Sequence, residues 1–233
     1  IFDGGSFCID KEGKLVFQAP FFKEYDDTFT FDFNKKNKTI KSNYNKMQNL
    51  YDALVLSFRD YMNGSGFSRA LMGISGGIDS ALSLSLACDS IGKKNVMCVF
   101  LPTKFTSNES LKDSEMLCKN LGIKLEHINI EYLRKQFNLT LKKPFKKFVK
   151  DVTEENIQSR IRGSILMAIS NKFNSMLITT GNKSELAVGY STIYGDMCGG
   201  YSIIKDLYKS DVYRISRWRN KNFTPLCKCK FLN

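Results

Sequence analysis

Hydrophobic residues from about residue 50 onward switch between short continuous runs and helical spacing. The apolar runs have the length and composition of buried strands. They fill 70–74, 96–101, 125–130 and 176–180. Between the runs, apolar residues recur every three or four positions, most clearly from Ile157 through Ile161 and Ile165 to Ile169. Strands that alternate with helices in this way predict an α/β fold: a doubly wound, mostly parallel sheet with helices on both faces.

Helix ends are marked by capping residues. The segment 64–66 (G-S-G) should end a helix that carries apolar residues from Leu50 onward. Ser107 precedes another helical stretch, which Gly122 should close. Thr153, followed by two glutamates, is the expected start of the helix with the isoleucine stripe.

The first part of the chain has a different pattern. Phe7 and Ile9 alternate with polar residues before a polar turn, and a second alternating run follows, so residues 1–33 predict a β-hairpin unit. Residues 34–46 are polar and basic, which indicates a linker. The main domain is then expected to occupy residues 47–220.

Composition limits the functional classes. The formal net charge of the 233 residues is +12, which favours an anionic partner such as a nucleotide, although a lysine-rich coding bias produces the same charge. The longest apolar runs are too short to cross a membrane. Seven scattered cysteines without C-x-x-C, together with a single histidine, argue against a zinc site and favour a reduced, cytoplasmic location. The chain begins at Ile1 without an initiator methionine, and we expect it to be part of a longer protein.

The segment G-I-S-G-G-I-D-S at 73–80 joins the first predicted strand to a helix. Its two adjacent glycines allow backbone N–H groups to face an anion without obstruction by a side chain. The hydroxyl groups of Ser75 and Ser80 add hydrogen-bond donors, and the helix N-terminus adds partial positive charge. Asp79 would repel a phosphate unless a cation lies between them, so we interpret it as a Mg²⁺ ligand. The loop therefore predicts a polyphosphate site.

This loop differs from a Walker A loop, because it lacks the G-x-x-x-x-G spacing and the following Lys-Ser/Thr. It resembles the pyrophosphate-binding motif of ATP pyrophosphatases, which split ATP into AMP and pyrophosphate. The alternative interpretation is a glycine-rich turn needed only for close packing. The motif's position between a strand and a helix favours the phosphate site.

Later segments narrow the resemblance. They are E-N-I-Q-S-R-I-R-G at 155–163, T-G-N-K-S-E at 180–185, G-Y-S-T-I-Y-G-D at 189–196 and K-D-L-Y-K at 205–209. Together with the phosphate loop, they are similar to the synthetase domain of glutamine-dependent NAD⁺ synthetases, and the similarity runs from about residue 50 to residue 219. It implies an adenine nucleotide alpha-hydrolase-like fold. The hairpin at 1–33 resembles the end of the nitrilase-like glutaminase domain that precedes the synthetase in that family.

The resemblance implies roles for the matched positions. The implied ATP-binding residues are Gly73, Ser75, Gly76, Gly77, Asp79, Ser80, Thr180 and Lys209, and the implied catalytic residues among them are Ser75, Asp79 and Lys209. The implied deamido-NAD⁺ contacts are Asn156, Arg160, Glu185 and Asp196, with Asn156 acting across a homodimer interface. Asp79 and Glu185 are the implied Mg²⁺ ligands. Asn156 and Arg160 are one helical turn apart, so they should share a helix face.

The implied reaction is the ATP-dependent amidation of deamido-NAD⁺ to NAD⁺. ATP is the co-substrate, and ammonia is supplied by glutamine in the full-length protein. The resemblance also implies a homodimer or a higher homo-oligomer. We expect neither a membrane nor a nucleic acid as partner, and the lysines of 142–150 are interpreted as part of a solvated amphipathic segment.

The family pattern ends near Asn220, and residues 221–233 form a divergent or truncated tail. Whether this chain is active by itself is therefore left open at this point. Two alternatives to NAD⁺ synthesis also stay open. One is an ATP pyrophosphatase that acts on tRNA or another acceptor, which the loop and the basic charge would both fit. The other is an inactive nucleotide-binding remnant.

Overall fold

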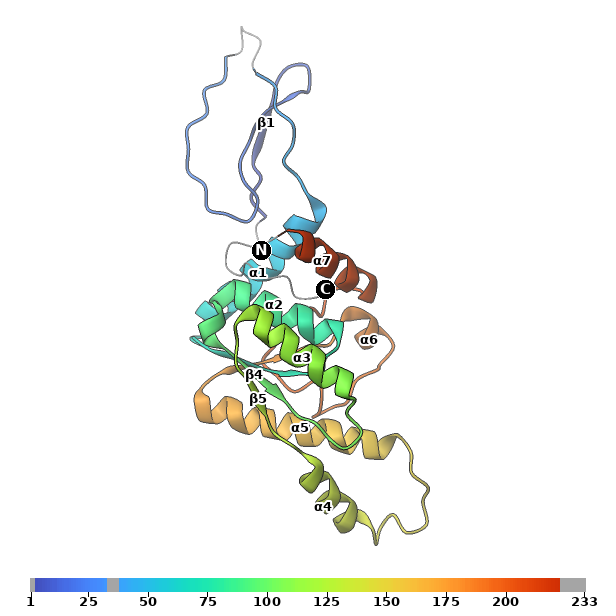
Figure 1. Cartoon of the computed structure of the whole chain (residues 1–233). Coiled ribbons are helices and arrows are strands. Elements are labelled where there is room, and N and C mark those ends of the chain that lie inside the picture. The colour runs from blue at the N-terminus through green and yellow to red at the C-terminus, as the bar shows by residue number, and fades with distance from the viewer. Residues whose placement is uncertain (1–2, 33–37, 223–233) are drawn as a thin grey trace. The chain divides into compact units, whose positions relative to one another are not determined.

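Five parallel strands form the main sheet of the computed structural model, which describes residues 3–32 and 38–222 (Figure 1). The strands are β3 (Ala70–Ile74), β4 (Val96–Phe100), β5 (Leu125–His127), β6 (Met176–Thr179) and β7 (Tyr201–Ser202), arranged in the order β5-β4-β3-β6-β7. The four predicted apolar runs are all strands of this sheet. β7 has only two residues, too few to leave a recognisable pattern in the sequence.

Helices connect the strands and cover the sheet. Their bounds are α1 (Lys46–Gly64), α2 (Ile78–Ile91), α3 (Asn108–Leu121), α4 (Glu131–Leu141), α5 (Val152–Phe173), α6 (Lys183–Ala187) and α7 (Lys209–Lys221), with a 3₁₀ turn at Lys93–Asn95. Figure 1 shows α2 and α3 on one face of the sheet and α5 on the other. The prediction of a doubly wound parallel sheet is confirmed.

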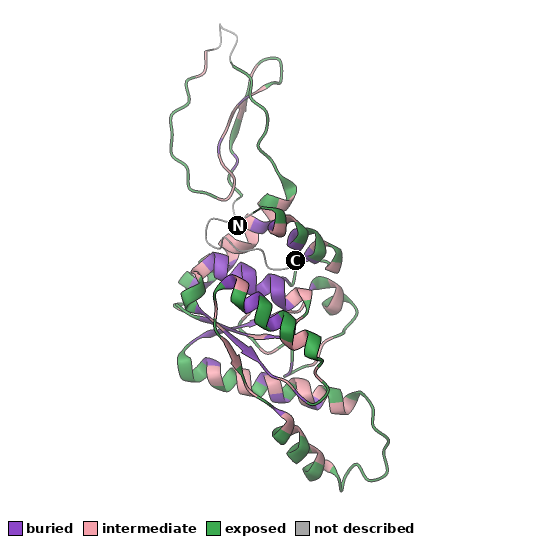
Figure 2. Ribbon diagram, in the orientation of Figure 1, coloured by how far each residue is buried: buried purple, intermediate pink, exposed green. Residues whose placement is uncertain are grey.

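The core lies on both sides of the sheet. On one side, α2 is buried from Ser80 to Ser90, which explains why its sequence is apolar or small all round rather than amphipathic. On the other side, Ile157 and Ile161 of α5 join a buried cluster with strand residues such as Leu71 and Leu177. Ile165 and Ile169 pack against the same cluster, so the predicted isoleucine stripe is confirmed. Figure 2 shows that burial is concentrated along the sheet and α2.

The chain separates into two compact units, Ile1–Ser57 and Phe58–Asn233. The first contains the predicted hairpin, formed by β1 (Phe7–Ile9) and β2 (Leu15–Gln18) in antiparallel pairing. The Phe17 ring stacks on Phe29 with 4.9 Å between the ring centroids. The assigned domain boundaries stay predictions, and residues 1–2 and 33 of the hairpin unit, 34–37 of the linker and 223–233 of the tail lie outside the described residues.

Three predicted helix ends are confirmed and one is wrong; α1 ends at Gly64, within the predicted stop at 64–66. The Ser107 side chain caps α3 by accepting a hydrogen bond from the Ser110 backbone N–H at 3.1 Å, and Gly122 closes this helix in a left-handed conformation. The predicted start at Thr153 is wrong, because Asp151 caps α5 and the helix begins at Val152. The Asp151 carboxylate accepts from the Thr153 N–H, and the Glu154 carboxylate accepts from the Asp151 N–H. The two acidic residues after Thr153 suggested a helix start at Thr153, whereas the capping box begins two residues earlier, at Asp151.

The Ser107 cap gives a first prediction. Ser107→Ala should lower the free energy of unfolding by about 1 kcal/mol, because it leaves N–H groups of the first turn of α3 without an acceptor. Ser107→Asn, which retains a capping oxygen, should unfold like the unmodified chain. Urea denaturation of the three proteins measures the difference. Equal midpoints for the alanine and asparagine variants would show that the cap contributes nothing.

Among residues 3–32 and 38–222, no helix combines the length and the hydropathy that a membrane span needs.

Candidate functional site

The loops after β3 and β6 meet at the carboxyl edge of the sheet. β3 lies between β4 and β6, and the chain crosses from β3 to β4 before it returns to β6 on the other side. Strand order therefore reverses between β3 and β6, which is the place where open α/β sheets bind ligands. The side chain of Asn182, after β6, donates a hydrogen bond to Asp79, after β3, at 3.1 Å. The predicted shared position of the two loops is confirmed.

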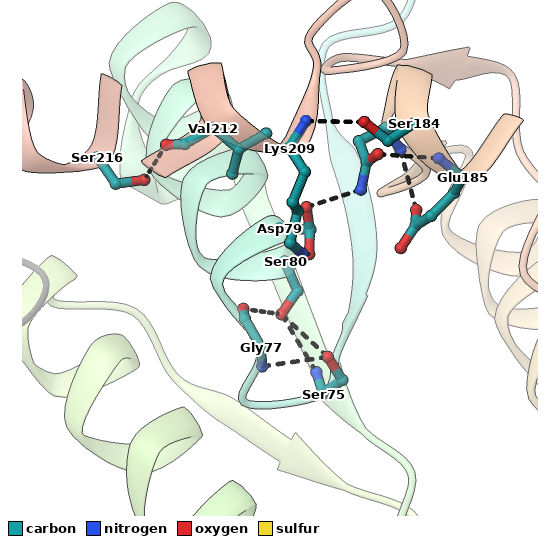
Figure 3. A network of polar contacts seen from close by, with 10 residues as sticks. Ser75, Gly77, Asp79, Ser80, Ser184, Glu185, Lys209, Val212 and Ser216 are labelled. Atoms are coloured by element: carbon teal, nitrogen blue, oxygen red, sulfur yellow. Dashed lines mark hydrogen bonds and ion pairs between the residues drawn. The ribbon is translucent and has the colours of Figure 1, made fainter. Parts of the chain in front are cut away.

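The phosphate loop is closed by its own hydroxyl groups. The Ser80 hydroxyl donates to the Gly77 carbonyl at 2.9 Å, and the Ser75 and Ser80 hydroxyls lie 3.2 Å apart (Figure 3). The Ser75 hydroxyl oxygen accepts from the Gly77 N–H. Gly77 is the N-cap residue of α2 and supplies no side chain to cap it. The N-terminus of α2 is thus left for an external anion, as expected of a phosphate-binding loop.

Gly76 is required by both backbone angle and space. Its φ of +81° lies in the left-handed region. A Cβ atom at this position would lie 2.7 Å from the Ser110 carbonyl oxygen on α3. The loop therefore rests directly on the first turn of α3, and only glycine allows that approach.

Substituting Gly76 should lower the stability of the chain by more than the strain of its positive φ angle accounts for. Gly76→Ala should destabilise the chain by more than the roughly 1–2 kcal/mol of an alanine in left-handed conformation, because the loop must also move away from Ser110. Gly66→Ala is the matched control, since Gly66 has a φ of +72° with open space around it. Thermal unfolding and ATP binding of both variants measure the effect. Equal losses of stability with unchanged ATP affinity would contradict this account of the loop.

Asp79 is the centre of a polar network at the start of α2 (Figure 3). Its carboxylate forms an ion pair with the Lys209 ammonium group and accepts the hydrogen bond from Asn182. Asn182 is fully buried and caps α6: its side chain accepts from the Glu185 N–H, and the Glu185 carboxylate accepts from the Asn182 N–H. Lys209 is held at the start of α7 by a bond from its backbone N–H to the Ser184 hydroxyl. Asn182 therefore links the two predicted metal carboxylates.

The two carboxylates suit a magnesium ion. Mg²⁺ in nucleotide sites is bound by one or two carboxylates and completed by phosphate oxygens and water. Among the residues described, no group of three or more His, Cys, Asp or Glu side chains could hold a metal ion by itself. Asp79 and Glu185 are of the ligand type that such a nucleotide-completed site uses.

A cavity of about 610 Å³ adjoins the phosphate loop. Its walls come from the ends of β3, β4 and β6, from α5 and from the segment 189–198. Its lining includes the predicted residues Gly73, Ser75, Thr180, Asn156 and Asp196. Gly76, Gly77, Asp79, Ser80, Glu185 and Lys209 lie outside this lining, in the loop and the network beside it. The candidate site thus has a polar phosphate end and a larger mixed cavity.

The segment 189–196 is fixed by the predicted dinucleotide contacts. The Asp196 carboxylate accepts from the Thr192 N–H at 2.6 Å, and the Asn156 side-chain oxygen accepts from the Thr192 hydroxyl at 3.0 Å. Arg160 donates from Nε to the Ile193 carbonyl at 3.2 Å and does not line the cavity. The structure brings these three residues together around one loop, but it places Arg160 on the outer side.

Helical geometry explains the position of Arg160. At about 100° per residue, the cavity face of α5 runs from Glu155 through Ser159 to Arg162. Asn156 lies at the edge of this face, and Arg160 lies one step beyond it. Sequence reasoning assigned no role to Arg162 or Asn182, although both belong to the motif segments. The spacing of these two residues from the other motif residues was the only signal in the sequence. That signal could be used only with the knowledge of which helix face meets the cavity.

The loop between β4 and α3 forms another wall. Thr106 lines the cavity, and its hydroxyl oxygen accepts from the Thr103 N–H at 2.9 Å. Glu131, on α4, accepts from the Lys104 N–H and binds Arg134 through two hydrogen bonds. The bond with Arg134 is the main reason that the pKa of Glu131 is lowered to about 2. The Glu131 carboxylate therefore stays charged at neutral pH and continues to hold this loop.

An S-G-G-x-D-S loop at the switch point of a parallel sheet, beside a large cavity, defines a nucleotide-binding protein of the ATP-pyrophosphatase class with an adenine nucleotide alpha-hydrolase fold. The family model for NAD synthase matches residues 50–227. The chain therefore belongs to the NAD synthase family.

Individual relatives agree with the family match. The chain is 47% identical over 230 residues to the glutamine-dependent NAD(+) synthetase of Rhodobacter capsulatus, an alignment that covers 97% of this chain and 42% of that protein. Among solved structures, the glutamine-dependent NAD⁺ synthetase of Acinetobacter baumannii in complex with ADP matches with a TM-score of 0.89 and 41% identity, over 97% of this chain and 44% of that one. The NH3-dependent NAD synthetase of Campylobacter jejuni matches with a TM-score of 0.69 and 31% identity, over 76% of this chain and 75% of that one. This chain thus spans less than half the length of the glutamine-dependent relatives.

Proposed function

We propose that this chain carries the synthetase part of an NAD⁺ synthetase, a ligase that uses ATP to convert deamido-NAD⁺ to NAD⁺. The observation that carries the proposal is the junction of the phosphate loop with the T-G-N-K-S-E segment, through Asn182 and Asp79, at the edge of a cavity large enough for nucleotide groups. Membership of the NAD synthase family supports the choice of acceptor.

The phosphate end would bind ATP. The N-terminus of α2 and the backbone of Gly76 and Gly77 would hold phosphate oxygens, and Ser75 and Ser80 would keep the loop in its binding shape. Asp79 and Glu185 would hold Mg²⁺, which when bound supplies positive charge at the phosphates. The Lys209 side chain would move its ammonium group away from Asp79 and toward the departing pyrophosphate, where negative charge develops.

The cavity would hold the reacting groups. A carboxylate oxygen of the nicotinate attacks the α-phosphorus of ATP, the bond to the β-phosphate oxygen breaks, and pyrophosphate leaves. Ammonia then attacks the acyl carbon, loses a proton, and displaces AMP to give the amide. Asn156, Arg160 and Asp196 each make a hydrogen bond to a residue of the segment 189–196, and through this segment Arg160 and Asp196 would position the dinucleotide. The chain's contribution is positioning and charge stabilisation rather than covalent catalysis.

Nitrogen supply and assembly complete the proposal. Ammonia would come from glutamine hydrolysed by a glutaminase part of the longer protein, as the name of the Rhodobacter capsulatus relative indicates for that protein. We also propose a homodimer or a higher homo-oligomer, in which Asn156 would contact the dinucleotide bound by the partner. Light scattering measures the assembly directly.

The test is a direct assay of the purified chain. It is incubated with ATP, Mg²⁺ and deamido-NAD⁺, with ammonium in one reaction and glutamine in another, and NAD⁺ and AMP are quantified. NAD⁺ and AMP in equal amounts from ammonium, with none from glutamine, would support the proposal. AMP release that does not require deamido-NAD⁺ but requires another acceptor, such as tRNA, would replace it.

A further inference from the structure

The cavity contains one positive charge whose role the reaction scheme leaves open. Arg162, on α5, is the only Lys or Arg among the described residues that line the cavity. The same lining contains the carboxylates of Glu155 and Asp196. Nucleotides bring several phosphate groups into such a cavity, and two carboxylates there repel them. The position of the single cation therefore restricts where a phosphate group can lie.

Arg162 is anchored through one nitrogen only. Its Nε donates to the Leu101 carbonyl at 3.1 Å, and this is the only hydrogen bond that Arg162 makes within the described residues. Burial lowers the pKa of the guanidinium, and no carboxylate acts in the opposite direction. Arg162 is half-buried, and a partly desolvated cation without an anionic partner is disfavoured, because the lost hydration is not offset by pairing. A bound anion would offset this cost.

The anchor lies close to the phosphate loop. Phe100 of β4 is in register with Ile74 of β3, so Leu101 and Ser75 are the next residues on two neighbouring strands. Neighbouring strands are about 4.8 Å apart. The carbonyl that anchors Arg162 thus directly follows the strand that lies beside β3, the strand that leads into the loop that would hold the polyphosphate.

We propose that Arg162 binds a phosphate group of a bound nucleotide through its two terminal nitrogens. This inference rests on the proposed function, which supplies two sources of that phosphate: ATP and the pyrophosphate bridge of deamido-NAD⁺. The position beside the loop favours the α-phosphate of ATP, since this group is continuous with the phosphates on the loop. A planar guanidinium suits two phosphate oxygens at once, whereas an ammonium group does not.

Binding measurements on variants of the whole chain test this inference. The variants are Arg162→Met, Arg162→Lys and the control Arg59→Met. Arg59 makes the same kind of anchor, from Nε to the Ser90 carbonyl at 3.0 Å, and lies away from the cavity. Calorimetry gives the Kd of four ligands: AMP, ATP with Mg²⁺, deamido-NAD⁺ and adenosine. Adenosine is the nucleoside of AMP without its phosphate.

We expect Arg162→Met to weaken AMP and ATP binding by about 10- to 100-fold, from the loss of a charge-assisted hydrogen bond. The Kd values of Arg162→Lys should lie between those of Arg162→Met and those of the unmodified chain. Arg59→Met should bind AMP and ATP as tightly as the unmodified chain does. Adenosine should bind all of them equally, which shows that the cavity itself is intact. A loss confined to deamido-NAD⁺ would support the phosphate contact and identify the dinucleotide as its source.

Two results would overturn the inference. Unchanged affinity for every nucleotide in Arg162→Met would show that no phosphate contacts this residue. An equal loss for adenosine and AMP would show that Arg162 only shapes the cavity. Neither result contradicts the proposed function if the unmodified chain forms NAD⁺. Failure of the unmodified chain to bind any nucleotide would contradict both the proposed function and the inference about Arg162.

Discussion

Asp79→Asn should slow NAD⁺ formation from ammonium by at least about 100-fold while leaving the chain folded. Asparagine has nearly the same shape, so the start of α2 and the contact with Asn182 can persist. It is neutral, however, and can neither ligate a cation as a carboxylate does nor form an ion pair with Lys209. The expected loss is therefore of charge at the phosphate site rather than of structure.

The control removes an acidic residue elsewhere on the same unit. Asp113 is exposed on α3, and Asp113→Asn should leave the rate unchanged. Circular dichroism and the rate of NAD⁺ formation at several Mg²⁺ concentrations would be measured for both variants. A weakened metal site predicts that high Mg²⁺ partly restores the Asp79→Asn rate. Full activity of this variant at low Mg²⁺ would exclude Asp79 as a metal ligand.

The sequence allowed prediction of the features that depend on local pattern. Buried parallel strands are continuous apolar runs, and 70–74 and 176–180 could be recognised as strands for that reason. The phosphate loop was recognisable because its residue types and their order are required by one local structure. Features with a short local pattern were missed. α6 has five residues, and the signal that starts it, the capping of Asn182 with Glu185, was noticed only as part of a motif.

The side chains that line the cavity depend on tertiary packing, which periodicity alone does not define. Sequence spacing placed Asn156 and Arg160 on one face of α5, and this is geometrically correct. Which part of that face meets the cavity depends on the segment 189–198, whose backbone approaches α5 closely at Gly163. A Cβ at Gly163 would lie 2.9 Å from the Gly195 carbonyl oxygen. With the segment packed here, Arg162 lines the cavity and Arg160 does not, so the assignment required the fold.

The ion pairs between α2 and α7 were equally invisible in the sequence. Asp79 pairs with Lys209, and ten residues further along each helix Asp89 pairs with Arg219. Ten helical residues span about 15 Å, so the two helices are joined at two points about that far apart. The first pair lies at the proposed phosphate site, whereas the side chains of the second pair are almost completely buried. We infer that the second pair holds α7 in the position from which Lys209 reaches the phosphate loop.

Breaking the enclosed pair should have the largest effect on stability. The side chains of Asp89 and Arg219 are 2% and 1% exposed, and Nε and Nη2 of Arg219 lie 3.1–3.3 Å from the carboxylate oxygens. Arg219→Met would leave the buried Asp89 carboxylate without the guanidinium that it pairs with. The free energy of unfolding should fall by about 3–5 kcal/mol. Urea denaturation measures this loss.

A double-mutant cycle separates the pair from the other contacts of these two residues. Asp89→Ala combined with Arg219→Met removes both charges, so it should destabilise the chain by about 1–3 kcal/mol less than the sum of the single changes. Arg214→Met is the surface control on the same helix. The exposed Arg214 side chain lies 3.2 Å from the half-buried Asp211 carboxylate, and loss of this pair should cost less than about 1 kcal/mol. Additive single effects would mean that Asp89 and Arg219 stabilise α7 independently. If Asp89 and Arg219 are energetically coupled, Arg219→Met should also weaken ATP binding in the folded fraction. The reason is that α7 would no longer be held in the position from which Lys209 reaches the phosphate loop.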